Sequence, residues 1–413
     1  MMLGLMLARR GVPVTVLEAH HDFDRDFRGD TLHPAILEII DQLDLSDKLH
    51  AIPHVKWTGP SLVVNGQVVA RIDFGRLKTP FPYVMIVAQE RFLELLAAEA
   101  AESPHFRLVM GAKVQELIEH DGTITGVRYR ESGTDQWHEV HATLTVGADG
   151  RFSRVRHLAG IEPQILSKPM ELLWFRLARR DGDAAKFDSV DALLRRKPLA
   201  VLNAADGSAA GFIRRGNRIL MIAFNRIDHW QVAYIYPPGS YHELKAAGLD
   251  AFRQSVAALE PEFAPHLATL VDWSALSPLS VAFSRCRSWH RPGLLLIGDA
   301  AHVMTPAAGA GIKYAIEDAV EAANLLAAPL LTGTLNQQHL ASVQRRREWP
   351  TRVMQRLASI QQRNLFTSLA DRDAAQRPPG VPLILRFLLR IPWLRDLPAR
   401  FIAFGVRRVR VRG

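Results

Sequence analysis

The chain has 413 residues, of which 48% are hydrophobic and 23% charged, a composition that suits one large or two moderate cores and excludes a disordered or fibrous protein. Cys286 is its only cysteine, which excludes a disulfide framework and a cysteine-based metal site and makes the cytoplasm the expected location. The net charge is +9, and much of it comes from residues 386–413, where eight arginines accompany a single acid.

The first eighteen residues predict part of a nucleotide-binding fold. Residues 1–11 form an apolar stripe followed by two arginines, with Gly11 where a left-handed helix cap is expected. Residues 12–17 are mostly apolar and β-branched, which predicts a buried parallel strand ending at Glu18. In a complete dinucleotide fold a strand and a G-x-G-x-x-G loop come first, and the acid holds a ribose hydroxyl. Only seventeen residues precede Glu18, which leaves no room for that strand and loop in this sequence.

The middle of the chain predicts many strands and a few helices. Strands are expected at residues 61–72, 82–88, 113–119, 124–130, 137–146, 171–177, 218–225 and 231–236, and helices at residues 35–43, 89–102 and 243–259. This mixture predicts an α/β (α+β) protein, with a Rossmann-like nucleotide-binding domain at residues 1–60, 89–167 and 281–334. A sheet-rich substrate domain, residues 61–88 and 168–280, would be inserted into it.

The last third of the chain predicts a return to the nucleotide-binding domain, followed by a C-terminal helical region at residues 335–413. Residues 294–297 read as a short buried strand, and helices are expected at residues 309–327 and 345–365, with a linker at residues 372–380. The basic tail could lie on an acidic membrane surface, although helices packed on the body with solvated arginines are favoured. Nucleic-acid binding is not expected, because no binding module is recognisable.

Two motifs that pair glycine with aspartate carry the chemistry. Val146-Gly147-Ala148-Asp149-Gly150 places an acid between a strand and a helix, where Asp149 could order the turn or accept ligand hydroxyls. Leu296-Ile297-Gly298-Asp299-Ala300-Ala301-His302 is more specific. Its small residues let a flat ligand approach the backbone, and Asp299 at a strand end can bind a ribityl hydroxyl. The helix after Gly309 would direct its positive end toward the same place.

Together these motifs resemble the DG and GD motifs of the class A flavoprotein monooxygenases, the p-hydroxybenzoate hydroxylase-like family. Glu18 after its strand, Arg28 in the following loop and Gln89 at the start of a helix fit the same pattern. The resemblance implies FAD as the cofactor and NADH or NADPH as the co-substrate. It makes the following residues FAD contacts: Glu18, Arg28, Gln89, Asp149, Gly298, Asp299, Pro306, Gly309 and Gly311.

The loop expected along the isoalloxazine ring contains Pro306, Gly309, Ala310, Gly311 and Lys313, and no certain catalytic side chain is assigned. Lys313 stands where the family usually has asparagine, so it could add positive charge beside the flavin or clash with it. Ala315 stands where many relatives have glycine. Because the glycine loop is also absent, we expect this chain to bind FAD weakly or not at all.

Several residues have simpler interpretations. His302 is expected to be a packed, hydrogen-bonded histidine, and no group of residues has metal-ligand spacing, so no metal is expected. Core positions are favoured over substrate contacts for the aromatic residues of the sheet-rich region, which are Trp174, Trp230, Tyr234 and Tyr236.

The resemblance implies an FAD-dependent monooxygenase, in which NAD(P)H reduces the flavin and O2 adds at its C4a atom. The resulting hydroperoxide would hydroxylate an aromatic, lipophilic or other electron-rich small molecule. Two alternatives stay open: an FAD-dependent dehydrogenase or reductase of the same fold, and a truncated, non-catalytic relative that does not retain FAD.

Overall fold

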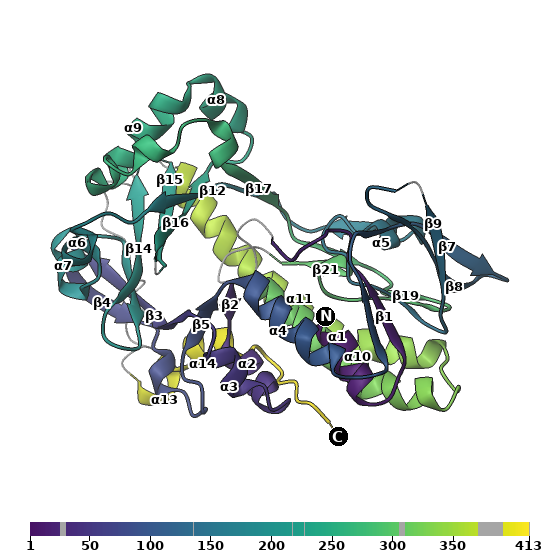
Figure 1. Cartoon of the computed structure of the whole chain (residues 1–413). Helices are drawn as coiled ribbons and strands as arrows, with labels where there is room; N and C mark the ends of the chain where they lie inside the picture. The colour runs from purple at the N-terminus through teal and green to yellow at the C-terminus, as the bar shows by residue number, and fades with distance from the viewer. Residues whose placement is uncertain are drawn as a thin grey trace.

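A computed structural model describes residues 1–24, 30–134, 136–216, 218–226, 228–304, 310–370 and 391–412. Figure 1 shows a sheet-rich part at the upper left, a group of long helices in the centre and a small sheet at the right. The mixed α/β class expected from the sequence is confirmed, because long helices and a large mixed sheet occur in one chain.

The N-terminal elements confirm the helix and strand expected there. Helix α1 (Met2–Arg9) is followed by Gly11 at φ +82°, a left-handed conformation that glycine adopts without strain. Strand β1 (Val14–Leu17) then pairs in parallel with β6 (Phe106–Val109). Helix α4 (Gln89–Ala101) precedes β6 and also matches its expected position.

A second parallel pair carries the two glycine–aspartate motifs. Strand β10 (Thr145–Gly147) pairs with β20 (Leu294–Leu296), and β19 (His290–Arg291) pairs with the other edge of β20. Within the described residues this three-stranded sheet and the pair of β1 and β6 are separate sheets. The long helix α10 (Ala310–Leu331) follows β20 and packs against both α1 and the turn after β20.

The largest sheet has ten strands. In spatial order these are β17 (Ser277–Val281), β12 (Met170–Ala178), β16 (His229–Tyr236), β15 (Ile219–Asn225), β14 (Ala209–Gly216), β13 (Ala200–Ala204), β3 (His54–Val64), β5 (Val84–Val87) and β2 (Thr31–Leu32), and β4 (Gln67–Arg71) pairs with β3. Because the sheet begins at Thr31, it includes strands that precede residue 61. The division of the chain into domains stays a prediction.

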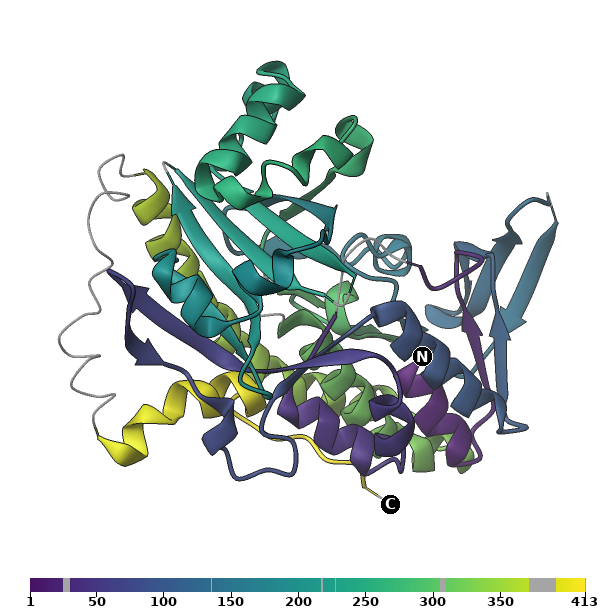
Figure 2. The same cartoon turned by 60° about the vertical axis from the view of Figure 1, so that its left-hand side comes forward.

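Helices cover one face of this sheet, as the teal helices of Figure 2 illustrate. They are α6 (Asp183–Phe187), α7 (Val190–Arg195), α8 (Tyr241–Ala246) and α9 (Leu249–Leu259). Beneath them lies an aromatic core in which Phe187, Phe212, Trp230 and Phe263 pack with ring centroids 5.0–5.9 Å apart. The geometry of these pairs is typical of aromatic packing in protein interiors.

Smaller elements complete the body. An antiparallel meander contains β7 (Ala112–His120), β8 (Thr123–Glu131) and β9 (Trp137–His141), and a further sheet contains β11 (Pro163–Ile165), β18 (Ser284–Cys286) and β21 (His302–Val303). Three short helices also belong to the body: α2 (Pro34–Asp41), α3 (Ser46–His50) and α5 (Arg154–Leu158).

Some element boundaries differ from the sequence-based expectation, among them the start of α11 (Gln337–Ala370), which lies eight residues before the expected residue 345. Residues 61–72 hold the end of β3 and all of β4, because Asn65 and Gly66 form a turn with positive φ. The helix expected at residues 243–259 is broken into α8 and α9 at Gly248, where φ is +92°. The strand expected at residues 137–146 is likewise two strands, β9 and β10.

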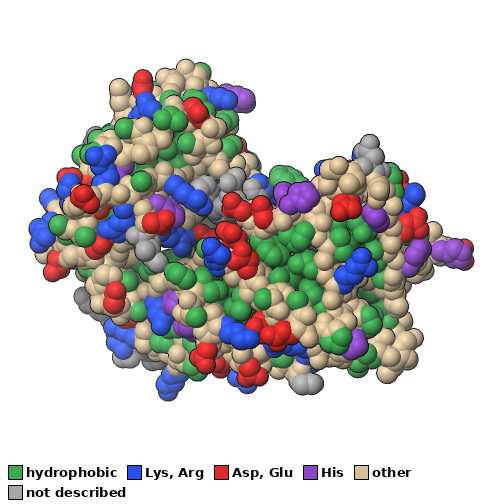
Figure 3. All heavy atoms as spheres, in the orientation of Figure 1, with side chains coloured by type: hydrophobic (Ala, Val, Ile, Leu, Met, Phe, Trp, Pro, Cys, Tyr) green, Lys and Arg blue, Asp and Glu red, His purple; other side chains and the backbone are tan. Residues whose placement is uncertain are grey.

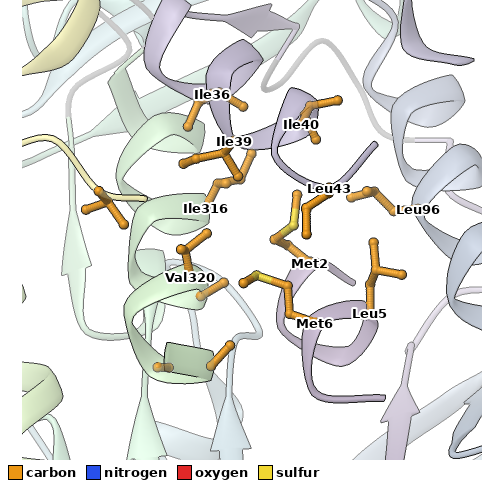
Figure 4. Packing of buried hydrophobic residues seen from close by; sticks show 14 of the residues in the cluster. Met2, Leu5, Met6, Ile36, Ile39, Ile40, Leu43, Leu96, Ile316 and Val320 are labelled. Atoms are coloured by element: carbon orange, nitrogen blue, oxygen red, sulfur yellow. The ribbon is translucent and has the colours of Figure 1, made fainter. Parts of the chain in front are cut away.

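One apolar core holds together helices α1, α2, α4 and α10. Figure 4 shows Met2 and Met6 of α1 toward Ile316 and Val320 of α10, Leu5 on the side of Leu96, and isoleucines of α2 closing the cluster. Leu96 of α4 and the β20 residue Leu295 belong to the same core. The elements that carry Glu18, Gln89 and Asp299 therefore pack on a shared set of buried side chains.

The C-terminal region contains the 34-residue helix α11 (Gln337–Ala370), then α13 (Pro392–Arg395) and α14 (Leu397–Phe404). Ala399, Ala403 and Phe404 are buried against Ala35 and Phe74, which agrees with the packed alternative for the tail. The linker expected at residues 372–380 lies outside the described residues. Of the helices that are described, none combines the length and apolar character needed to cross a membrane.

Candidate functional site

Asp149 and Asp299 are brought to the same edge of a sheet by parallel pairing. Gly147 is in register with Leu296, and each aspartate follows its strand within three residues. Carboxyl ends of parallel strands are where α/β folds bind nucleotides. Glu18 follows the carboxyl end of β1 in the other parallel sheet. Its backbone N–H donates to Val109 O at 2.9 Å.

The side chain of Asp149 orders its own turn. Its Oδ2 accepts the backbone N–H of Val155 at 3.0 Å, and its Oδ1 accepts the hydroxyl of Ser153, which caps helix α5. The sequence left open whether Asp149 orders the turn or binds ligand hydroxyls. The structure places the carboxylate in the first of these roles.

Arg156 links the two motif turns. One of its guanidinium nitrogens, Nη1, donates to the carbonyl oxygen of Ala300 at 3.0 Å, and Nη2 donates to Arg151 O at 3.0 Å. Arg156 therefore contacts the carbonyl group immediately after Asp299 and the loop immediately after Asp149. Sequence reasoning missed this residue, because an arginine within a short helix has no distinctive pattern.

The Gly298–Asp299 turn is tightly constrained. Gly298 is buried, has φ +59°, and a Cβ added to it would lie 3.0 Å from the Cβ of Ala315. Its backbone N–H donates to Asp318 Oδ2 at 2.9 Å. The methyl group of Ala315 therefore leaves room for glycine, but hardly for a side chain, at position 298. Asp299 itself is half-buried.

Helix α10 begins beside this turn, and its first residues keep space open. A Cβ added to Gly311 would meet no atom within 4 Å. A 22-residue helix directs the positive end of its dipole toward ligands at its N-terminus. Pro306 and Gly309 lie outside the described residues, as does the side chain of Ala310.

Lys313 lies in the protein interior. Its Nζ is 3.9 Å from Glu317 Oε1 and 4.8 Å from the ring centroid of Tyr314. Desolvation lowers the pKa of Lys313, and Arg347 lowers it further, whereas Glu317 opposes both effects. These contacts place its charge within a buried cluster between α10 and α11.

His302 is confirmed as a packed, hydrogen-bonded histidine. Its Nε2 is 2.6 Å from Asp318 Oδ2, and its ring centroid is 4.7 Å from that of Trp289. The described residues contain no group of histidine, cysteine or acidic side chains that could hold a metal ion.

Gln89 lies at the first position of α4, beside a junction between the two parts of the molecule. Asp30 accepts the backbone N–H of Gln89 and pairs with Arg226 at the end of β15. Desolvation raises the pKa of Asp30, and the charge of Arg226 opposes that rise. Arg28, the other contact expected here, lies outside the described residues.

A cavity of about 180 Å³ opens at this junction. Figure 3 shows acidic and basic side chains mixed in the hollow between the two parts. The polar lining residues include Asp30, Gln89, Arg176, Arg226, His229 and Gln231. Sequence reasoning missed all of these except Gln89, because they lie on strands and loops far apart in the chain.

The aromatic residues of the sheet-rich part lie on two opposite faces of the large sheet. Trp230, Tyr234 and Tyr236 are at most 4% exposed and belong to the core under the helices. Trp174 lies on the other face, only half-buried, with its ring centroid 6.2 Å from that of Phe224. Val303, shortly after the Gly298–Asp299 turn, packs in the cluster on this second face.

The parallel pair with its two aspartate turns, joined to a large sheet, defines a flavoprotein of the class A monooxygenase type. The chain belongs to the FAD-binding domain family, whose sequence profile matches residues 1–357. The 6-methylpretetramide 4-monooxygenase of Streptomyces rimosus is 29% identical over 412 residues, covering 99% of this chain and 91% of that relative. The relatives and the family establish this chain as an FAD-dependent monooxygenase.

Solved structures share the fold. The p-nitrophenol 4-monooxygenase PnpA from Pseudomonas putida DLL-E4 has a TM-score of 0.71 and 21% identity, covering 99% of this chain and 96% of PnpA. PqsL from P. aeruginosa, in complex with 2-aminobenzoylacetate, has a TM-score of 0.68 and 19% identity, covering 91% of this chain and 94% of PqsL. These similarities confirm the class A flavoprotein fold.

Proposed function

We propose that this FAD-dependent monooxygenase uses NADH or NADPH and O2 to hydroxylate an aromatic or other electron-rich small molecule. The observation that carries the proposal is the pairing of β10 with β20, which places the Asp149 and Asp299 turns side by side. The names of the relatives support an aromatic substrate, since 6-methylpretetramide and nitrophenol monooxygenases are among them.

The described residues fit an extended dinucleotide cofactor. Open space lies beside the backbone at Gly311 and at Gly150, where an added Cβ would meet nothing within 4 Å. Close approach of a ligand to glycine backbone is typical of nucleotide sites. In this proposal the residues that hold FAD are Glu18, Arg28, Gln89, Gly298, Asp299, Pro306, Gly309 and Gly311, and Asp149 contributes by ordering the turn beside them.

FAD, when bound, supplies hydride acceptance and oxygen activation. The protein's part is to bind and orient. Asp299 offers a carboxylate at the end of β20, and the N-terminus of α10 favours negative charge near Gly311. The Ser153-capped α5 holds Asp149 in a fixed turn, so this part of the site is formed before a ligand arrives.

The substrate would lie against the sheet face that carries Trp174 and Phe224. These rings are half-buried, and the same face reaches the cluster that contains Val303. A pocket lined by apolar rings with a few polar groups at one end is typical of small-molecule sites. The polar end would be the cavity around Arg226, His229 and Gln231.

The test uses the full chain, added FAD, NADH or NADPH, and a panel of substituted phenols. Because the sequence predicts weak FAD binding, FAD is added in excess. We then expect flavin binding, phenol-stimulated oxidation of the nicotinamide, and one atom of ¹⁸O from ¹⁸O2 in the product. Product formation without oxygen would instead support the dehydrogenase or reductase alternative. Lack of any flavin binding by the folded protein would contradict both enzymatic functions.

A further inference from the structure

The Gly298–Asp299 turn is held by a carboxylate that the nucleotide motifs do not include. Asp318, on the third turn of α10, accepts the Gly298 N–H at 2.9 Å and the His302 Nε2–H at 2.6 Å on its Oδ2. Its Oδ1 accepts Arg347 Nε of α11 at 2.7 Å. Three donors from three different elements therefore meet on one side chain.

This arrangement is buried. Asp318 and Arg347 are both 0% exposed, and His302 is 1% exposed. An isolated buried carboxylate would be strongly unfavourable, but hydrogen bonds and a buried guanidinium offset that cost. Although desolvation raises the pKa of Asp318, the charges and hydrogen bonds of His302 and Arg347 outweigh it, and the net effect lowers the pKa. Asp318 is therefore a carboxylate across the neutral pH range.

We propose that Asp318 is a positioning residue that fixes the Gly298–Asp299 turn in the geometry needed to bind FAD. The proposal rests on the assignment of Asp299 as an FAD contact. Arg347 acts through Asp318: it also donates Nη2 to Glu317 Oε2 at 2.7 Å, so its guanidinium is fixed on two neighbouring carboxylates. Groups that orient a binding residue affect affinity even though they do not touch the ligand.

A neutral amide cannot replace this carboxylate. Asparagine has one acceptor oxygen and one amide nitrogen that only donates. In an Asp318→Asn variant the amide nitrogen would replace one of the two carboxylate oxygens. It would then point its own N–H groups either at the Gly298 and His302 donors or at the Arg347 donor, and those hydrogen bonds would be lost. Either the Gly298–Asp299 turn would lose its hydrogen bond to residue 318, or the side chain at position 318 would lose the bond to Arg347 that orients it.

The chain offers a matched control on the same helix. Glu321 is also buried in α10 and pairs with an arginine of α11, with Arg346 Nη1 at 3.3 Å from its Oε2. Within the part of the chain that the structure describes, it makes no hydrogen bond or ion pair with the Gly298–Asp299 turn. Glu321→Gln removes a buried acid one turn further along α10, whose arginine partner is 32% exposed, so it controls for the loss of a carboxylate on this helix.

The experiment compares the parent protein, Asp318→Asn and Glu321→Gln by FAD titration and by hydrogen exchange of the FAD-free proteins. We expect Asp318→Asn to raise the FAD dissociation constant about 10-fold or more and to speed amide exchange at residues 296–302. Glu321→Gln should leave both close to the parent values. Equal changes in the two variants, or a parent-like FAD affinity in Asp318→Asn, would overturn the proposal.

Two further variants keep the test decisive. If Asp318→Asn does not fold, Arg347→Lys retains the charge but cannot span both carboxylates, and it should also weaken FAD binding and loosen residues 296–302. A parent-like result for Arg347→Lys overturns the proposal. Asp299→Asn tests the underlying assignment separately: if it binds FAD as the parent does, the assignment of Asp299 fails, and the proposed link between the turn and FAD fails with it.

Discussion

Arg226 and Asp30 form an ion pair across the junction between the large sheet and the segment that enters β2, although 196 residues separate them. The same guanidinium donates to Gln231 Oε1, and the same carboxylate accepts the N–H of Gln89 at the start of α4. The pair therefore connects the sheet that would hold substrate to a helix that would contact FAD.

Arg226→Met should weaken this junction. Both partners are less than 20% exposed, so removing the arginine leaves the Asp30 carboxylate without its charged donor. Hydrogen bonds to charged groups contribute about 1.5–3 kcal/mol, and we expect a loss of that size in the free energy of unfolding measured with urea. Arg91→Met, which breaks the exposed pair with Glu94, should cost much less.

A double-mutant cycle makes the same point without relying on one variant. Asp30→Asn and Arg226→Met should each lower the free energy of unfolding. The double variant should lose less than the sum of the two single losses, because it leaves no unpaired buried charge. Strict additivity of the two losses would show that Arg226 and Asp30 do not interact in solution.

Trp174→Ala should impair substrate binding and leave FAD binding intact. The ring lies on the sheet face away from the helix-covered core, so its loss removes aromatic contact without opening that core. With the phenol that incorporates most ¹⁸O, we expect KM to rise about 10-fold, equivalent to about 1.4 kcal/mol. Trp137→Ala, on the exposed face of the meander, is the control and should leave KM unchanged. A parent-like KM for Trp174→Ala would place the substrate elsewhere.

The sequence predicted those features that local patterns determine. The small-residue motif around Asp299, the buried strand before it and the helix after it all lie where expected, because strand and helix periodicities and glycine positions act over a few residues. Gly11 likewise marks the end of α1 with a left-handed conformation. The boundaries were wrong where a single glycine breaks an otherwise helical pattern, as Gly248 does.

Long-range contacts could not be predicted in this way. Strand β16 is buried on both faces, so its sequence does not reveal that Trp230 and Tyr234 face the helices while Gln231 faces the cavity. The bonds of Arg156 to Ala300 and of Arg226 to Asp30 join residues more than 100 positions apart. Such contacts depend on the packing of whole elements, which periodicity does not specify.

Cys286 should be chemically inert in the folded protein. Its thiol is buried, and desolvation raises its pKa to about 11, with Arg156 opposing and Glu162 adding to the shift. Because the thiolate is the reactive form, its population at pH 8 falls about 100-fold or more relative to an ordinary cysteine. We expect a disulfide reagent such as DTNB to react very slowly with the native protein and rapidly after denaturation. Rapid reaction with the native protein would contradict the buried position of β18.

The buried pair of Asp183 and His266 should make stability depend on pH in the acid range. His266 Nε2 lies 2.9 Å from Asp183 Oδ2, and the same carboxylate accepts the indole N–H of Trp230 at 3.3 Å and the backbone N–H of Arg180 at 3.0 Å. Desolvation raises the pKa of Asp183, but these hydrogen bonds outweigh it, and the pKa in the folded state lies below the ordinary value of 3.8. The unfolded chain therefore binds a proton at higher pH than the folded chain does.

It follows that Asp183 stabilises the fold fully above its unfolded pKa, and that this contribution is lost as the pH falls through the lower, folded-state pKa. At pH 7 we expect Asp183→Asn to lower the free energy of unfolding by about 1–3 kcal/mol, because the amide is uncharged and its nitrogen would replace Oδ1, which lies 3.1 Å from His266 Nε2. Unfolding in urea from pH 7 down to pH 3 should show the parent losing stability more steeply than Asp183→Asn, so the two curves converge below about pH 4. Parallel curves over that range would mean that the partners of Asp183 do not stabilise its ionised form over its protonated form. Packing alone would then hold the core around Trp230.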